Sequence, residues 1–276
     1  MDVSLTNDVE EYAAAVEAFL LGDPVLNNVA LTVLAQLRAG VPFGSGRPTF
    51  AVVRAGDTVV GAASRTPPHP LLLASMCTDA IEALAEVWPA DDTPGVTGIA
   101  ATSAIFAARW AARTGKSMRR TMVTRIYRVS AVRPPCEVPG SLRPASMDDV
   151  DLVTAWAVAF GGDTGATLGD VRPGIVHRIA ARHVFLWELS GRPVALTVRG
   201  PAVGGIVRVS LVYTPPELRR RGYATACVAN VSRLALDDGA RGCMLYADLA
   251  NAMTNAIYQR LGYAPVCDAA DYRFDG

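Results

Sequence analysis

Part of the sequence recurs later in the chain at a fixed offset, and this repeat limits the folds that the chain can adopt. Residues 50–56 match residues 185–191, and residues 71–75 match residues 206–210, both at an offset of 135 residues. In each copy a glycine turn separates two β-prone runs, which predicts a β-hairpin followed by a third strand. We therefore expect two successive copies of one α/β unit. Because the identities are few, two unrelated segments with a chance match stay an alternative.

The second copy is longer than the first. Arg113 and Gly115 match Arg260 and Gly262 at an offset of 147, so the second copy holds 12 additional residues between positions 210 and 260. In the first copy the chain passes almost directly from the third strand into a helix after Met76. The additional length is therefore a feature of the second copy alone.

A proline-rich segment separates the two copies. Residues 133–140, RPPCEVPG, contain three prolines, which prevent regular structure. A chain of 276 residues suits two domains of ordinary size, and a composition of 51% hydrophobic and 19% charged residues is that of a globular protein. We expect domains at residues 1–134 and 135–276.

The second domain is expected to open with a short strand at residues 142–145 and then a helix. Ser146, with Asp149 three residues later, has the pattern of a capping box, and the helix should run to about Phe160. Residues 161–165, GGDTG, predict a flexible loop. A further helix should follow this loop.

Residues 207–224, VRVSLVYTPPELRRRGYA, combine a strand with an expected anion site. Apolar residues alternate with other residues up to Tyr213, which is the period of a strand, and Pro215 and Pro216 end it. Three arginines and Gly222 then precede an apolar helix. The N–H groups at a helix N-terminus lack partners and attract anions, and a glycine lets a ligand approach the backbone. The pattern favours a diphosphate site, with a solvated basic turn that caps a helix as the alternative.

The spacing Arg219-x-x-Gly222-x-Ala224 after such a strand resembles the pyrophosphate loop of the GNAT superfamily of acyl-CoA-dependent N-acyltransferases. Residues 243–249, CMLYADL, are similar to the family's next strand, and residues 251–263, NAMTNAIYQRLGY, to its closing helix and turn. The resemblance covers roughly the second half of the chain. It implies an α/β (α+β) fold of two tandem GNAT-like domains, each with a mixed, mostly antiparallel central sheet flanked by helices. The first domain would be degenerate because it lacks the arginine-glycine loop.

The resemblance also implies a cofactor site. Acetyl-CoA would be the co-substrate, and no metal is expected. A bulge in the central strand would expose N–H groups that hold the pantetheine arm and polarise the thioester carbonyl, and the loop would hold the diphosphate. The residues expected to contact the cofactor are Val212, Tyr213, Thr214, Arg219, Arg220, Arg221, Gly222, Tyr223, Ala224, Thr225 and Asn251.

Tyr258 is the candidate general acid. It follows Asn251 by seven residues, which places both on one face of a helix, about two turns apart. A phenol with an ordinary pKa near 10 can protonate a departing thiolate, and the family's tyrosine at this place has that role. The alternative is an aromatic side chain that only packs Ile257 and Leu261 against the sheet. Asn251, as a helix N-cap, also needs no ligand to explain it.

The general base is not evident from the sequence. Some relatives carry a glutamate five residues before the asparagine, where this chain has Tyr246. Asp248 is the preferred candidate for a second catalytic residue beside Tyr258. Glu217 and a chain of water molecules are alternatives, and a simple cap or ion-pair role for Asp248 is an equal one.

The composition argues against several other classes of function. Five widely spaced cysteines without a C-x-x-C pair predict reduced thiols, and neither they nor the three histidines have metal-site spacing. A formal net charge of zero favours neither nucleic acid nor a membrane as partner. The acidic N-terminus is unlike a secretory signal, and no apolar run reaches the length of a membrane helix. We therefore expect a cytoplasmic protein.

The sequence as a whole predicts an N-acyltransferase that transfers an acetyl group from acetyl-CoA to an amine of a small molecule or peptide by direct attack. The resemblance is also compatible with a homodimer. A dinucleotide-binding oxidoreductase is disfavoured because the loop lacks G-x-G-x-x-G and no suitable βαβ unit follows it. The alternative, from a non-enzymatic class of function, is a binding module of transferase-like fold that holds an acyl-CoA or a partner protein without turnover.

Overall fold

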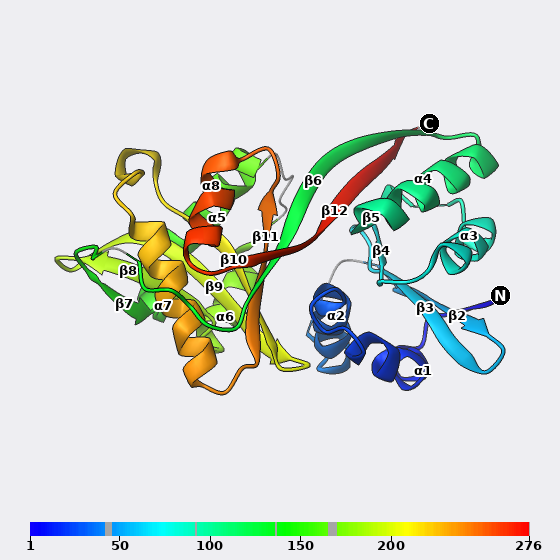
Figure 1. Ribbon diagram of the computed structural model, residues 1–276, viewed down its shortest axis with the longest axis horizontal. Helices are drawn as coiled ribbons and strands as arrows, with labels where there is room; N and C mark the ends of the chain where they lie inside the picture. The colour runs from blue at the N-terminus through cyan, green and yellow to red at the C-terminus, as the bar shows by residue number, and fades with distance from the viewer. Residues whose placement is uncertain (42–45, 92, 136, 165–169, 276) are drawn as a thin grey trace. The chain divides into compact units, whose positions relative to one another are not determined.

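The computed structural model describes the chain except for residues 42–45, 92, 136, 165–169 and 276. Contacts within the chain divide it into two compact units, each built from strands and helices (Figure 1). Unit 1 is Met1–Ile126, Ala247–Asn251 and Val266–Gly276, and unit 2 is Tyr127–Tyr246 and Ala252–Pro265. The chain therefore returns to unit 1 twice after it has left it.

Unit 1 combines a mostly antiparallel sheet with helices. Its strands occur in the order β1-β2-β3-β4-β5-β12-β6. Strands β1 to β4 run antiparallel in succession, β4 and β5 are parallel, and β12 runs antiparallel to β5. The elements are β1 Asp2–Thr6, α1 Val9–Leu21, α2 Asn28–Arg38, β2 Thr49–Ala55, β3 Thr58–Arg65, β4 Leu71–Leu73, α3 Thr78–Val87, β5 Gly95–Ile99, α4 Ala100–Thr114, β6 Ser117–Val129 and β12 Ala264–Asp275.

Unit 2 repeats this arrangement, with the strand order β11-β10-β9-β8-β7. Strands β7 to β10 run antiparallel in succession, and β10 and β11 are parallel. The elements are β7 Ser141–Pro144, a 3₁₀ turn Met147–Asp149, α5 Val150–Thr164, α6 Arg172–Ala180, β8 Val184–Leu189, β9 Arg192–Val203, β10 Ile206–Tyr213, a 3₁₀ turn Pro216–Leu218, α7 Tyr223–Asp237, β11 Gly242–Asp248 and α8 Ala252–Arg260.

The positions of the strands confirm the predicted duplication. Strands β4 and β10 begin 135 residues apart, whereas β5 and β11, and likewise β6 and β12, begin 147 residues apart. The hairpin glycines also correspond, since Gly56 and Gly191 have φ values of 60° and 76°, which glycine adopts without strain. The insertion in the second copy thus lies between β10 and β11, as the sequence predicted.

The last strand of each copy crosses the division between the units. Strand β12 ends the second copy, but its residues from Val266 onward belong to unit 1, where Ala269 pairs with Ile99 of β5. Strand β6 ends the first copy, and its final residues from Tyr127 onward belong to unit 2. The expected domains 1–134 and 135–276 therefore describe the repeat in the sequence rather than these contact-based units.

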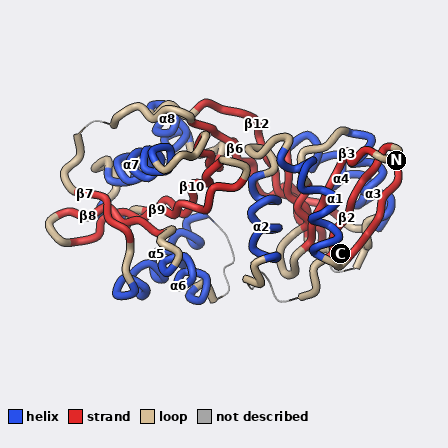
Figure 2. Tube along the Cα trace, turned by 90° about the horizontal axis from the view of Figure 1, so that it is seen from below, coloured by secondary structure: helices blue, strands red, loops and turns tan. Residues whose placement is uncertain are grey.

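Helices cover both faces of the sheet in unit 2. Figure 2 shows α5 and α6 on one side of strands β8 to β10, with α7 and α8 on the other. Helix α5 packs on β10, and α7 packs on β8, β9 and β10. The core beneath α5 and α6 consists of Ala145, Val150, Val153, Ala157, Ile175, Ile179, Val184, Leu186, Leu196, Val198 and Tyr213.

The start of α5 follows the sequence pattern, but its end does not. The Ser146 backbone N–H donates to Asp149 Oδ2 at 2.8 Å, which confirms the capping box. The predicted loop is wrong for residues 161–164, which continue α5, while Gly165 lies outside the described residues. Gly161 is buried and Thr164 donates to the Phe160 carbonyl at 2.9 Å, so packing and a local hydrogen bond outweigh the low helix propensity of glycine. No helix in the described ranges is long and apolar enough to cross a membrane.

Candidate functional site

Strand β10 contains a bulge near its C-terminal end. Ser210 pairs with Val198 and Tyr213 with Leu196, so β10 advances by three residues where β9 advances by two. Leu211, inside this interval, has a φ of 48°, in the left-handed region that leucine rarely adopts. A strained residue at a bulge redirects the backbone groups that follow it. The sequence located the irregularity near Val212, and the structure begins it one residue earlier.

After Arg208, strand β10 no longer pairs with β11 among the described residues. In the described residues the parallel register between the two strands ends at Arg208 and Met244. Val212 and Tyr213 therefore lie in a part of β10 for which the described residues pair with β9 alone, and Thr214 directly follows the end of the strand. The Thr214 hydroxyl is buried and has no hydrogen-bond partner among the described residues, although buried hydroxyls are usually satisfied. The end of β10 thus offers unpaired polar groups of the kind that bind an extended amide ligand.

The arginine loop leads from β10 into α7 through left-handed backbone. Arg220 and Gly222 have φ values of 64° and 82°, and Gly222 is the N-cap of α7. Gly222 provides no side chain to cap the helix, so the first N–H groups of α7, on Tyr223, Ala224 and Thr225, keep their capacity to bind an anion. A Cβ at position 222 would lie 2.9 Å from Val138 Cγ2. The glycine is therefore required both by its backbone conformation and by its neighbour.

The three arginines of the loop differ in their contacts. Arg219 forms an ion pair with Asp163, donates through Nε to the Thr214 carbonyl at 3.0 Å and lies 5.9 Å from the centre of the Tyr213 ring. Its guanidinium is thus used to fix the loop to the end of β10. Arg220 and Arg221 are exposed, and no carboxylate of the described residues forms an ion pair with them. These two side chains are the ones that remain available to an anion.

Tyr258 lies in a buried group of tyrosines on the α8 side of unit 2. Its ring centre is 6.2 Å from that of Tyr127 and 5.9 Å from that of Tyr263. Burial raises the pKa of the Tyr258 phenol well above its usual value, so the hydroxyl stays protonated across the physiological range. None of the described residues hydrogen-bonds to this hydroxyl, whereas Tyr263 Oη lies 2.7 Å from Ser232 Oγ. Tyr258 therefore has the protonation state of an acid and an uncommitted hydroxyl.

Tyr127 was not identified from the sequence as part of this region. Its hydroxyl donates to Asn255 Oδ1 at 2.8 Å and accepts from Gln259 Nε2 at 3.3 Å, so it fixes two residues of α8. Because Tyr127 lies near the end of β6, the last strand of the first copy, the repeat assigned it to the other domain. No local signal in the sequence distinguishes it from the other strand residues around it.

Asp248 and Asn251 take part in the turn between β11 and α8. Asp248 Oδ1 accepts from the Ala250 backbone N–H at 2.9 Å, and the Asp248 carbonyl accepts from the Asn251 N–H at 3.1 Å. Both residues belong to the segment Ala247–Asn251 of unit 1, whereas Tyr258 and the arginine loop belong to unit 2. The turn contacts agree with the cap role that the sequence left open for Asp248.

Comparison with known proteins agrees with this geometry. Residues 155–263 match the model of the Acetyltransferase (GNAT) family, an interval that contains the bulge, the arginine loop and Tyr258.

Residues 155–263 are thus similar to the GNAT family of acetyltransferases.

Solved structures resemble the chain over its whole length. A GNAT-family acetyltransferase from Colwellia psychrerythraea is similar at 9% identity with a TM-score of 0.66, and the match covers 100% of both chains. A Drosophila protein is similar at 14% identity with a TM-score of 0.72, covering 99% of this chain and 98% of that one. A tandem GNAT protein from the clavulanic acid biosynthesis pathway is similar at 13% identity with a TM-score of 0.55, covering 99% and 98%. A search of curated proteins found no significant match. The fold is thus that of two tandem GNAT-like domains.

The corresponding place in unit 1 is occupied by the protein's own side chain. Ser75, which matches Ser210 of the second copy, donates its backbone N–H to Asn27 Oδ1 at 2.8 Å. Asn27 is buried and also donates to the Leu20 carbonyl at 3.1 Å. Helix α3 begins soon after, with Asp79 in its first turn, which would repel a phosphate. In unit 1 the Asn27 side chain thus accepts from the Ser75 backbone N–H, next to the place where the second copy has its arginine loop.

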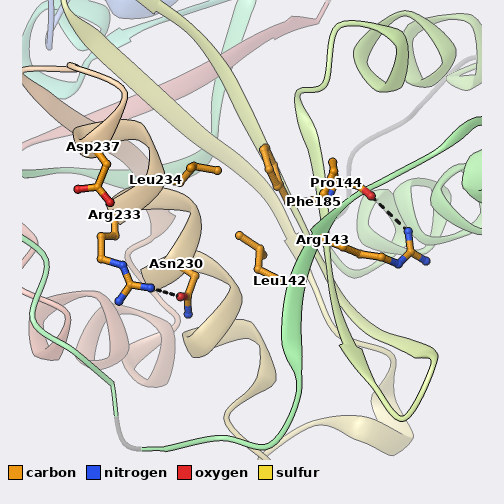
Figure 3. A pocket seen from close by; sticks show the side chains of 8 residues that line it. All are labelled: Leu142, Arg143, Pro144, Phe185, Asn230, Arg233, Leu234 and Asp237. Atoms are coloured by element: carbon orange, nitrogen blue, oxygen red, sulfur yellow. Dashed lines mark hydrogen bonds between the residues drawn. The ribbon is translucent and has the colours of Figure 1, made fainter.

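A separate groove of about 270 Å³ lies between the edge strand β7 and helix α7. Figure 3 shows Arg143 bending away from it toward the Pro144 carbonyl and Arg233 bonded to Asn230. Arg143 is further held by Asp149 and Glu188, at 2.7 and 2.5 Å. Because the arginines that line it are already bonded within the protein, this groove is a poor candidate for the site of chemistry. Its remaining lining residues are Leu142, Phe185, Leu234 and Asp237.

Proposed function

We propose that the protein is an N-acetyltransferase that uses acetyl-CoA as co-substrate and acetylates the amine of a small molecule or peptide. The proposal rests on three structural features that follow one another in the segment similar to the GNAT family. They are the bulge in β10, the unpaired end of that strand, and the arginine-glycine loop with its left-handed backbone. Each is a place where backbone N–H groups are exposed in a fixed geometry, and such groups stabilise developing negative charge on a thioester carbonyl.

The residues present fit the parts of acetyl-CoA. The N–H groups at the start of α7, with Arg220 and Arg221, would hold the diphosphate, since forked guanidinium donors and a helix N-terminus both favour it. Gly222 allows the phosphate to approach the backbone. Val212 to Thr214 would hold the pantetheine amides, and Thr214 would gain a partner for its orphan hydroxyl. Arg219 would keep the loop in place rather than bind the phosphate directly.

The reaction needs one bond formed, one broken and two proton movements. The amine nitrogen attacks the thioester carbon, the C–N bond forms and the C–S bond breaks, and the thiolate takes a proton from Tyr258. Burial raises the pKa of Tyr258, which keeps the phenol protonated so that its proton is present when the thiolate leaves, although the same shift makes the phenol a weaker acid. The amine loses its proton to water or to Asp248. The contact of Asp248 with the Ala250 N–H supports a structural duty for this carboxylate beside any chemical one.

The first copy, residues 1–134, would bind no acetyl-CoA. The Asn27 contact with Ser75 supports this proposal, because it uses a backbone donor at the place that corresponds to the site in the second copy. The cysteine pattern supports a cytoplasmic location, where thiols stay reduced. The assembly state remains open to a homodimer.

The test is thiol release from acetyl-CoA in the presence of a panel of amines, followed by mass spectrometry of the products. We expect a mass increase of one acetyl group on at least one amine and an equal amount of free CoA. Isothermal titration calorimetry with acetyl-CoA separates the alternative. Binding without thiol release for every amine would favour a module that holds acyl-CoA without turnover, and absence of both would contradict the proposal.

A further inference from the structure

Two arginines lie on the α5/α6 face of the sheet in unit 2. Ser210 pairs with Val198, which is part of the core beneath α5 and α6, and Arg208 precedes Ser210 by two residues of the same strand. Side chains two residues apart on a strand share a face, so Arg208 also faces these helices. Arg178 lies in α6, one turn after the core residue Ile175. The two side chains therefore lie on the same face of the sheet, near enough for the charge of Arg208 to lower the pKa of Arg178.

The charges of these two arginines have no ion-pair partner among the residues that the structure describes. Burial and then the positive charge of Arg208 lower the pKa of Arg178. Burial also lowers the pKa of Arg208, while the nearby Tyr246 acts in the opposite direction. Neither residue forms an ion pair in the described part of the chain. The acidic residues of unit 2 that do form ion pairs hold other arginines, in the pairs Arg143 with Asp149 and Glu188, Arg172 with Asp151, Arg199 with Asp238, and Arg219 with Asp163.

The surroundings add positive charge and polar groups. The pKa of His183 is lowered by burial and then by Arg199, His177 and Arg178, so this region is electropositive. On α5, which packs on β10, the Thr154 hydroxyl is buried and no residue that the structure describes hydrogen-bonds to it. Like charges held near each other in partly buried positions are unfavourable unless a counter-charge joins them. A bound anion would remove the repulsion.

We propose that the acceptor amine carries a carboxylate or phosphate group and that this group binds between Arg178 and Arg208. Two guanidinium forks suit the oxygens of either anion. Arg208 precedes the bulge residue Val212 by four positions, at most about 13 Å along the strand at a rise of ~3.3 Å per residue. An anion held there leaves the amine end of the acceptor directed along β10 toward the bulge. This inference rests on the proposed acetyltransferase function, since it names the acceptor class of that site.

The first experiment measures anion binding without turnover. The full-length protein is saturated with CoA, which keeps anions from the arginine loop, and is titrated with inorganic phosphate or with succinate at constant ionic strength. A ligand that binds only the folded state raises the melting temperature with its concentration. We expect this rise in the wild type and in Arg192→Gln, an exposed hairpin control, and a loss of at least half of it in Arg178→Gln and Arg208→Gln.

Two further features keep this test decisive. Arg178 is near the end of α6, so its variant reports on the site even if Arg208→Gln does not fold. Arg178→Gln also removes one of two like charges, so its melting temperature without anion should not fall below that of the wild type. An equal rise in all variants would mean adventitious anion binding only, and that result, or no rise in the wild type, would overturn the proposal.

The second experiment compares acceptors in pairs that differ in the anion only. β-Alanine is compared with its amide, and phosphoethanolamine with ethanolamine. We expect the wild type to prefer the charged member of at least one pair by tenfold or more in kcat/KM, with the preference lost in Arg208→Gln. The pair that shows this preference tells whether the site binds a carboxylate or a phosphate. A preference for the neutral members contradicts the proposal. If calorimetry finds no acetyl-CoA binding, the proposed function fails, whereas the response of the wild type and variants to phosphate still decides whether the arginines bind an anion.

Discussion

Gly222 is the residue whose replacement tests the arginine loop most directly. Its φ of 82° disfavours a branched residue, and a Cβ would meet Val138 Cγ2 at 2.9 Å. We expect Gly222→Val to weaken acetyl-CoA binding at least tenfold, because the loop must shift away from the phosphate. The matched control is Gly239→Val. Gly239, just past the other end of α7, has a φ of 94° but no atom within 4 Å of its Cβ position.

Isothermal titration calorimetry and thermal melting of the two variants separate binding from stability. Both substitutions impose backbone strain of about 1–3 kcal/mol, so both should lower the melting temperature. Only Gly222→Val should lower the affinity for acetyl-CoA. Equal affinity in the two variants would show that the loop does not contact the cofactor.

The tyrosines of unit 2 allow a chemical role to be separated from a packing role. Tyr258→Phe removes a hydroxyl to which no described residue hydrogen-bonds, so stability should change little. If this hydroxyl is the general acid, turnover should fall by roughly 10²–10⁴-fold. Tyr263→Phe removes the hydroxyl that lies 2.7 Å from Ser232 Oγ, and we expect it to cost about 1 kcal/mol of stability with nearly unchanged turnover. Steady-state kinetics and denaturant unfolding of both variants measure this. A loss of turnover below threefold in Tyr258→Phe would make Tyr258 a packing residue.

The start of α5 depends on the ionised Asp149 carboxylate. Hydrogen bonds from Arg143 lower its pKa to about 2 from 3.8, against an opposing effect of burial. Because the folded-state pKa is depressed, this contribution to stability is present above pH ~4 and is lost as the pH falls toward about 2. From the size of the shift it is about 2 kcal/mol.

Acid unfolding of Asp149→Asn measures this contribution. The variant should be less stable than the wild type at pH 7, and the difference should shrink between pH ~4 and ~2, where the wild-type carboxylate is protonated. Asp151→Asn, which removes an exposed ion pair with Arg172, is the control and should change stability little. A difference that does not depend on pH would mean that the amide, and not the lost charge, is responsible.

The role of the bulge in β10 can be tested by two substitutions of Leu211. Leu211 has a φ of 48°, which a residue without a Cβ adopts more easily. Leu211→Gly should therefore keep the bulge and retain acetyl-CoA binding. Leu211→Val places a β-branched side chain at the same φ and should reduce both stability and turnover. Thermal melting and kinetics of the pair decide this, and equal behaviour of the two variants would mean that the bulge has no functional role.

These elements show which features the sequence encodes locally. The hairpins, the capping box at Ser146 and the loop before α7 follow from residue types at fixed spacing, since glycine, proline and serine each restrict a few neighbouring dihedral angles. The left-handed Leu211 could not be read in this way, because leucine is not selected for that conformation and only the pairing of β9 with β10 imposes it. The end of α5 was missed because the packing of Gly161 outweighs its propensity.

At the scale of the whole molecule, the repeat predicted the order of elements but not the exchange of strands between units. Strand partners far apart in sequence are chosen by packing, and β12 carries no local signal that it pairs with β5. The Arg125 ion pair with Asp268, at 2.7 Å within unit 1, joins residues of the two sequence copies. Thr97 likewise donates to Asp271 at 2.5 Å. Unit 1 therefore cannot be completed from the first copy alone.

This exchange predicts how fragments of the chain behave. A fragment of residues 136–276 lacks Tyr127, so Asn255 loses the hydrogen bond from the Tyr127 hydroxyl, and β12 lacks β5. A fragment of residues 117–276 restores β6 and Tyr127 but still leaves the β12 edge without β5, and an exposed edge strand favours aggregation. We expect the melting temperature to fall in the order full chain, residues 117–276, residues 136–276. Acetyl-CoA affinity and turnover should follow the same order, because Tyr127 helps to fix α8, which carries Tyr258. If the fragment of residues 136–276 equals the full chain in all three measurements, the first copy is an independent module and the exchanged strands have no part in stabilising the catalytic half.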